Sequence, residues 1–235
     1  MDKLTICACS SRTFIDKSIV SRLAARAEAE GWNVDLIPDL CELAETDRER
    51  VRELAGTCVA ACHERAVKSL LGFCGVHAGK VLDLRSKEWG QILEQLGLSV
   101  GKPMNDLAEL EQKYKEQLDA FPVKAGEDAW FPTIDKDVCG ECGKCLDFCP
   151  FGVYEMVDGR VRVVHPTNCK NNCPACARTC PASAVIFPKY ERSPINGGVE
   201  REENAVQLDT RTLYAQAFRE RLEQRRAVSL AFKKG

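Results

Sequence analysis

The sequence predicts two fold classes in one chain, a parallel α/β domain in residues 1–98 and a smaller α+β domain in residues 134–190. In the first region, apolar strand-like segments alternate with helical patterns, as in parallel α/β sheets. The second region holds two short cysteine runs on either side of a hairpin pattern. We expect a helical linker at 99–133, and an extended segment with a C-terminal amphipathic helix at 191–235.

The predicted elements of the first domain follow its apolar periodicity. Residues 3–7 have the composition of a buried strand, and residues 16–31 place five apolar side chains on one helical face, namely Ile19, Val20, Leu23, Ala24 and Ala27. The same reasoning predicts the remaining strands and helices, in chain order strand 33–37, helix 48–54, strand 57–61, helix 64–71 and strand 80–84.

Two further amphipathic helices are expected outside the domains. After Pro103 the linker has apolar residues at helical spacing, namely Leu107, Leu110, Tyr114 and Leu118. In the tail, Asp209 can cap a helix whose apolar side consists of Leu213, Ala217, Phe218 and Leu222. The linker helix is expected to pack at the domain junction. The arginine-rich tail helix either clamps a partner subunit or packs on the N-terminal domain.

The composition is that of a soluble globular protein. The 235 residues are 45% hydrophobic and 29% charged, with a net charge of −2, so no general attraction to nucleic acid or membranes is expected. No stretch approaches the ~20 apolar residues of a membrane span. Residues 1–3 lead straight into a strand without the features of a secretion signal. We therefore expect a cytoplasmic protein whose thiols stay reduced.

Eight of the fourteen cysteines form two runs, each followed directly by a proline. The runs are Cys139, Cys142, Cys145 and Cys149, and Cys169, Cys173, Cys176 and Cys180. Three cysteines two or three residues apart can surround one face of a cuboidal iron–sulfur cluster, whose fourth thiolate must come from elsewhere. The runs therefore indicate two 4Fe-4S clusters. Two structural zinc sites are the alternative, although zinc knuckles supply two cysteines per turn and often recruit histidine.

Residues 134–187 resemble the bacterial-type ferredoxin domain with two 4Fe-4S clusters, so a ferredoxin-like fold is expected for this half. In that family the last cysteine of each run binds the cluster of the other run. The resemblance implies one cluster on Cys139, Cys142, Cys145 and Cys180 and a second on Cys149, Cys169, Cys173 and Cys176.

The second run departs from the family pattern by one residue, because three residues, 170–172, separate its first two cysteines where two are usual. Asparagine tolerates the left-handed backbone that such a loop needs, and two of the three are asparagine. Between the runs, two alternating segments, 153–157 and 160–164, flank Asp158-Gly159 and predict a hairpin.

Four other cysteines follow the predicted strands of the first domain. Cys7 and Cys9 follow the first strand, Cys41 follows the second, and Cys62 follows the third. The carboxyl ends of parallel strands share one edge, at which ligands usually bind, so these thiols predict a third 4Fe-4S cluster. The alternative is that these are buried free cysteines that act as small hydrophobic residues. That interpretation suits Cys58, in the middle of a strand, better than it suits Cys62.

Residues 3–90 resemble the N-terminal iron–sulfur domain of the heterodisulfide reductase flavin subunit, on the basis of Ile6-Cys7-Ala8-Cys9, Cys41 and Val59-Ala60-Ala61-Cys62. The resemblance implies a cluster on Cys7, Cys9, Cys41 and Cys62, with Cys74 as an alternative ligand. Ser10 stands where that family usually has glycine. No Gly-x-Gly-x-x-Gly turn follows a strand, so flavin and NAD are expected on another subunit.

These patterns predict an electron-transfer subunit rather than an enzyme in its own right. Two or three 4Fe-4S clusters would relay electrons within an anaerobic oxidoreductase complex, beside a flavin- or metal-containing partner subunit. No acid–base pair, nucleophile triad or substrate pocket is readable from the sequence. Two alternatives remain: the N-terminal cluster site reduces a disulfide or small substrate, or the chain is a redox sensor or scaffold.

Overall fold

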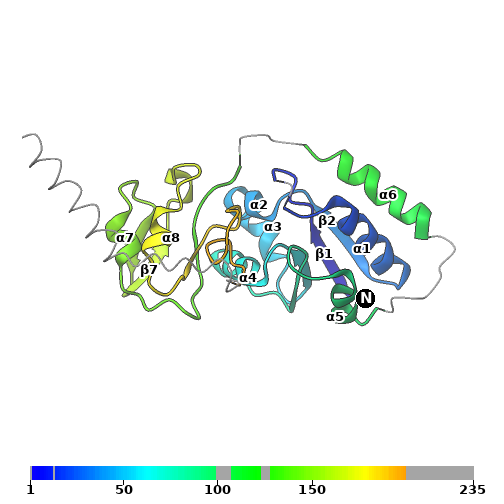
Figure 1. Cartoon of the computed structure of the whole chain (residues 1–235), viewed down its shortest axis with the longest axis horizontal. Helices are drawn as coiled ribbons and strands as arrows, with labels where there is room; N and C mark the ends of the chain where they lie inside the picture. Colours follow the sequence, from blue (N-terminus) through cyan, green and yellow to red (C-terminus); the bar gives the residue numbers. More distant parts are fainter. Residues whose placement is uncertain (1, 13, 99–106, 123–127, 200–235) are drawn as a thin grey trace, which may run out of the picture. The chain divides into compact units, whose positions relative to one another are not determined.

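The computed structural model describes residues 2–12, 14–98, 107–122 and 128–199. Its N-terminal part is a four-stranded parallel sheet with the order β2-β1-β3-β4 (Figure 1). The strands are β1 (Lys3–Cys7), β2 (Asn33–Ile37), β3 (Cys58–Ala61) and β4 (Lys80–Asp83). The mixed α/β architecture and the parallel sheet expected from the sequence are confirmed.

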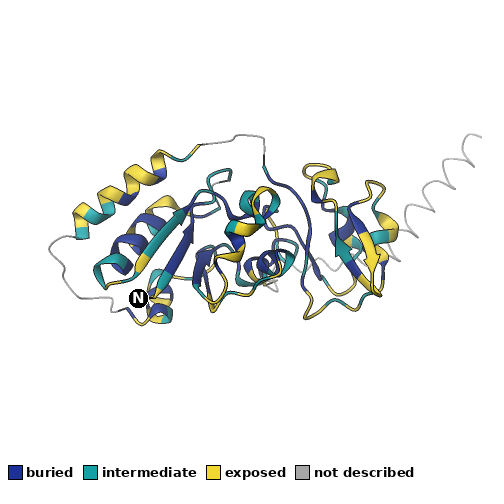
Figure 2. Cartoon of the chain, turned by 180° about the vertical axis from the view of Figure 1, so that it is seen from behind, coloured by how far each residue is buried: buried dark blue, intermediate teal, exposed yellow. Residues whose placement is uncertain are grey.

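Helices cover both faces of this sheet, because the side chains of each strand alternate between two hydrophobic cores. Leu4 and Ile6 face the core beneath α1 (Lys17–Ala29), α5 (Trp89–Leu96) and α6 (Leu107–Asp119). Val59 and Ala61 face the core beneath α2 (Leu40–Thr46), α3 (Arg48–Arg52) and α4 (Glu64–Phe73). Figure 2 shows buried residues along the central strands and mostly exposed residues on α6.

The C-terminal part contains two small antiparallel sheets and short helices. In one sheet β5 (Thr133–Ile134) pairs with β8 (Val185–Ile186), and in the other β6 (Tyr154–Val157) pairs with β7 (Arg160–Val163). The Asp158-Gly159 turn of this hairpin has φ values of 51° and 73°, which is the left-handed backbone that its sequence favours. The remaining elements are α7 (Lys144–Phe148), the 3₁₀ helix η1 (Pro166–Asn168) and α8 (Ala175–Thr179).

The segments flanking the C-terminal sheets connect the two parts, and the chain through Val199 forms one compact unit. Trp130 stacks on Phe187 with ring centroids 5.2 Å apart, within the C-terminal core. The next side chain, Phe131, points into the N-terminal core and contacts Phe73 of α4, again at 5.2 Å. Adjacent aromatic residues of one extended segment thus bury themselves in two different cores.

Some elements differ from their expected positions. The helices α2 and α5 are not predicted from the sequence, because they are only seven and eight residues long, which is too short for a periodic pattern to distinguish a helix clearly. The linker helix α6 packs along α1, where Tyr114 donates a 2.5 Å hydrogen bond to Glu28, rather than at the domain junction. The predicted tail helix lies outside the described residues. Within the described ranges, no helix combines the length and apolarity needed to cross a membrane.

Candidate iron–sulfur sites

Two cavities in the C-terminal part are each lined by four cysteines. The first ferredoxin cavity, of about 500 Å³ with its open mouth, is lined by Cys139, Cys142, Cys145 and Cys180. The second ferredoxin cavity, of about 310 Å³, is lined by Cys149, Cys169, Cys173 and Cys176. The structure therefore brings together the two sets of thiols that the ferredoxin resemblance implies, with the last cysteine of each run in the other run's cavity.

Two five-residue helices cause this exchange. The helix α7 includes Cys145 of the first cavity and ends at its C-cap Cys149, which belongs to the second. The helix α8 includes Cys176 of the second cavity and ends at its C-cap Cys180, which belongs to the first. Four residues of helix advance the chain by about 6 Å, enough to carry it from one cavity to the next.

The extra residue of the second run is accommodated as the sequence predicts. Asn172 has φ of 58°, in the left-handed region that asparagine tolerates. The backbone N–H of Cys173 donates to the carbonyl of Lys170 at 3.1 Å and closes the loop. Cys169 therefore still lines the second cavity with Cys173 and Cys176.

A buried tyrosine donates to one of these thiols, a contact that no sequence pattern predicts. The hydroxyl of Tyr154 donates to Cys176 Sγ at 3.1 Å. Burial raises the pKa of this phenol well above its usual range, so the hydroxyl stays protonated and remains a donor. Tyr154 is the first residue of β6, which packs beside α7.

Several of the ferredoxin thiols lie in a low-dielectric environment. Burial raises the pKa of Cys145 and Cys176 to about 11, and that of Cys169 to about 12. Nearby cysteines add to each shift, because neighbouring negative charges disfavour one another. Iron binds the thiolate form of cysteine, so cluster binding at these sites releases protons. The bound iron also compensates the negative charge of the thiolates, which is unfavourable in a buried cavity.

At the carboxyl edge of the parallel sheet the structure brings together Cys7, Cys9, Cys41 and Cys62, which we call the strand-edge site. Cys9, with φ of 49°, interacts electrostatically with the other three. Burial raises the pKa of Cys9 to about 11 and of Cys62 to about 12, and raises that of Cys7 and Cys41 well above the usual range.

The alternative ligand Cys74 belongs to the same hydrophobic core as Cys7 and Cys41, but its immediate surroundings differ from theirs. Its thiol faces the carbonyl of Ala44 at 3.9 Å, and its charged neighbours are Arg48 and Arg52 rather than other cysteines. Cys58 pairs in register with Lys80 at the amino end of the strands, which is the end opposite to the strand-edge site.

His63 directly follows Cys62 in the chain. Its imidazole Nδ1 lies 3.2 Å from the carboxylate of Asp83.

Each of the three sites offers four thiols, the ligand set of a 4Fe-4S cluster. The two ferredoxin cavities include no histidine or carboxylate among their lining residues, which suits thiolate-bound iron. Across the described ranges, no three His, Cys, Asp or Glu side chains close around a point tightly enough to hold a single metal ion.

Comparison with known proteins places this half of the chain in a family. Residues 131–181 match the 4Fe-4S dicluster domain. An uncharacterized ferredoxin of Methanocaldococcus jannaschii is 44% identical over 69 residues, which are 29% of this chain and 47% of that protein. Ferredoxin-3 of a Nostoc species is 35% identical over 88 residues, covering 28% of this chain and 90% of that ferredoxin. A ferredoxin of Methanothermococcus thermolithotrophicus is 36% identical over 55 residues, or 23% and 90% of the two chains.

The chain belongs to the 4Fe-4S dicluster ferredoxins through its C-terminal half, which confirms the iron–sulfur and electron-transport assignment made from the cysteine spacing. It spans about half the length of the Methanocaldococcus relative, at 47%. The family match does not extend into residues 3–90, so the resemblance of that region to a heterodisulfide reductase domain stays a prediction.

Proposed function

We propose that this chain is an electron-transfer subunit that relays electrons through three 4Fe-4S clusters, two in the ferredoxin cavities and one at the strand-edge site. The observation that carries the proposal is the partition of eight cysteines between two cavities in the interchanged pattern of dicluster ferredoxins. The strand-edge site adds four more thiols, buried or half-buried, at the ligand-binding edge of a parallel sheet.

The packing supports an order for the relay. Cys169 of the second cavity packs against the core that contains Cys7 and Cys41. Cys145 of the first cavity and Cys176 of the second interact electrostatically. These contacts support a relay in which the second cavity lies between the strand-edge site and the first cavity, so that electrons would pass through the three sites in that order or its reverse.

We further propose that the chain works within an anaerobic oxidoreductase complex, beside a flavin- or metal-containing subunit. The support is the absence of a dinucleotide-binding motif from the sequence and the exposed apolar side chains around the ferredoxin cavities. Phe148 and Phe151, which line the second cavity, are 49% and 40% exposed. Such side chains offer a contact surface for a redox partner. The tail, proposed to help in docking, lies outside the described residues.

Iron and sulfide analysis after anaerobic reconstitution tests this proposal. The full chain should hold about twelve iron and twelve sulfide, because three sites each bind one 4Fe-4S cluster. It should accept electrons from a low-potential reductant and show no oxidation of NADH. An iron content of about eight would mean that the chain binds only two clusters and would contradict the proposed strand-edge cluster. NADH oxidation by the isolated chain would contradict its role as a relay subunit.

A further inference from the structure

One buried lysine lies at the strand-edge site and belongs to the ferredoxin half. Lys189 follows β8 by three residues, yet its side chain is only 3% exposed. Its ammonium donates to Asp39 Oδ2 at 2.7 Å and also to Ser11. Ser11 in turn donates to the same carboxylate oxygen at 2.5 Å. Burying an ammonium is costly unless it is paired and hydrogen-bonded, as it is here.

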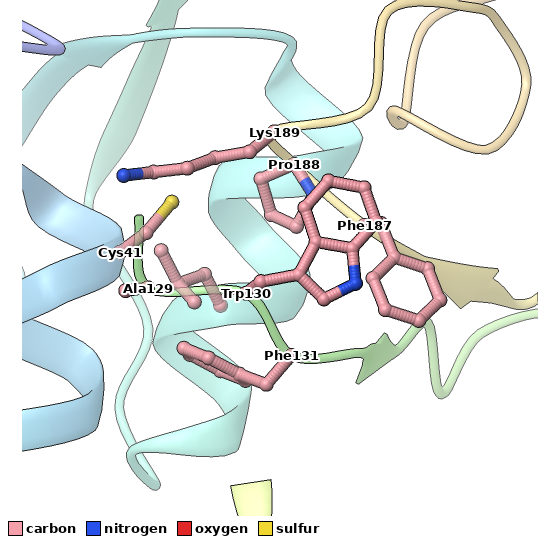
Figure 3. A pocket seen from close by; sticks show the side chains of 8 residues that line it. Cys41, Ala129, Trp130, Phe131, Phe187, Pro188 and Lys189 are labelled. Carbon is pink, nitrogen blue, oxygen red and sulfur yellow. The ribbon is translucent and has the colours of Figure 1, made fainter. Parts of the chain in front are cut away.

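The lysine also faces the thiols of this site. Figure 3 shows the side chain of Lys189 extending away from Trp130 and Phe187, with its ammonium directed toward Cys41. Its 2.7 Å ion pair with Asp39 Oδ2 compensates for the burial of the ammonium, because both side chains are almost fully buried. Lys189 therefore stays charged at the edge of the site.

The partner of the lysine fixes the segment that carries Cys41. The other oxygen of Asp39 accepts from the backbone N–H of Cys41 at 3.0 Å and of Glu42 at 3.2 Å, and so caps α2. Lys189 thereby influences Cys41 in two ways. Its charge acts on the thiol directly, and its ion pair holds the carboxylate that orients the start of the helix.

A second cation holds the lysine's own segment in place. Arg85, just after β4, donates to the carbonyls of Pro188, Tyr190 and Glu191 on either side of Lys189. The same guanidinium interacts electrostatically with Cys62 and Cys9. The segment 188–191 is thus tied across the strand-edge site, with Lys189 pointing into it.

We propose that Lys189 is a positioning residue of the strand-edge site, through which the ferredoxin half raises the reduction potential of the cluster bound there. Reduction adds one negative charge to a buried site, and a fixed ammonium beside Cys41 stabilises that charge. This inference rests on the strand-edge cluster of the proposed function. It makes the two halves interdependent, because the potential of one cluster is set by a residue of the other half.

An EPR-monitored redox titration of the reconstituted full chain tests the inference. Lys189→Met alone would leave Asp39 buried and unpaired, so the informative comparison is Asp39→Asn against the double variant Asp39→Asn/Lys189→Met. Both lack the buried carboxylate charge, and they differ only in the lysine. The double variant should titrate at a lower potential in the strand-edge signal, with the two ferredoxin signals unshifted. The strand-edge signal is identified by its loss in Cys62→Ser.

Two further variants serve as controls for the charge of Lys189 and for its position. Lys189→Arg should keep the wild-type potential, because it retains the charge. Lys80→Met removes a lysine at the opposite edge of the same sheet and should shift nothing. An equal potential in the two compared variants, at about twelve iron per chain, would overturn the inference and leave the cluster proposal standing. About eight iron in the wild type would overturn both.

Discussion

Cys62 and Cys74 illustrate how two cysteines close in sequence can differ in chemistry. Cys62 is half-buried and Cys74 is buried, both lie near the ends of elements, and the sequence makes both of them candidate ligands. In the fold, Cys62 lies beside Cys9 at the carboxyl edge of the sheet, whereas Cys74 lies beneath α3, beside Arg48 and Arg52. The strand that precedes Cys62 ends at this edge, while the ten-residue helix α4 carries the chain away from it before Cys74.

Replacing each of these two cysteines in turn should show which of them is a cluster ligand. Cys62→Ser should reduce the iron content from about twelve to about eight per chain and spare the ferredoxin spectrum. Cys74→Ser is the matched control and should retain all the iron. Equal iron loss in both variants, measured on anaerobically reconstituted protein, would contradict the strand-edge assignment.

Tyr154 gives a prediction for one ferredoxin cluster alone. Tyr154→Phe removes the hydrogen bond to Cys176 and keeps the ring that fills the core. Hydrogen bonds to cluster sulfurs raise the potential, so the cluster of the second cavity should shift lower by roughly 20–60 mV, equivalent to ~0.5–1.5 kcal/mol. The first-cavity cluster should stay unchanged in the same EPR titration. Tyr114→Phe, on α6, is the control and should shift neither.

At the scale of elements, the start of α4 is where the C-terminal segment meets the N-terminal domain. Gly197 has φ of +85°, and a Cβ added there would lie 2.7 Å from both the Cβ and the backbone nitrogen of Ala66. Neither atom can move without displacing the helix. Glycine is needed at this position both for its backbone conformation and for the close approach.

Gly197→Ala should therefore destabilise the contact between segment 194–198 and α4. We expect a cost of about 1–3 kcal/mol, which lowers the midpoint of thermal cluster loss by roughly 3–10 °C. Gly72→Ala, within α4, is the matched control, because an added Cβ there meets no atom within 4 Å. It should leave the midpoint equal or slightly higher. A similar loss in both variants, followed by visible absorbance, would contradict this account.

At the scale of the whole molecule, arginines connect the two halves. Arg65 of α4 lies 2.6 Å from Asp135 and also donates to the carbonyl of Ser183. Arg12 lies 2.5 Å from Asp128, whose side chain is 4% exposed. Each pair joins residues far apart in sequence, and together with Lys189 they hold the strand-edge site beside the second ferredoxin cavity.

The same packing determines where the tail can be removed. Asn196 is 2% exposed, and the carbonyl of Ile195 accepts from Phe187 at 2.7 Å, so a cut at either residue would damage the junction. Truncation after Val199 should leave the iron content and cluster spectra intact. It should weaken association with the partner subunit, and salt should weaken binding of the full chain by screening the tail arginines. Loss of iron on this truncation, or unchanged partner binding in a pull-down, would contradict a docking role.

The sequence by itself determined the chemistry that depends on local spacing. Runs of cysteines two or three residues apart restrict where their thiols can lie, so the ferredoxin domain could be predicted from that spacing alone. Strand and helix periodicity likewise predicted the parallel sheet, and with it the edge where Cys7, Cys41 and Cys62 meet.

Only the tertiary structure decided which distant side chains surround these thiols. Lys189 and Asp39 are 150 residues apart, and no local pattern marks the lysine as buried or paired. Tyr154 has its partner 22 residues away, across a hairpin and a loop. The same holds for the surroundings of Cys74, whose charged neighbours are Arg48 and Arg52 rather than other cysteines. Such contacts form when whole elements pack against each other. That packing depends on many residues distributed along the chain, so no local sequence pattern specifies an individual contact.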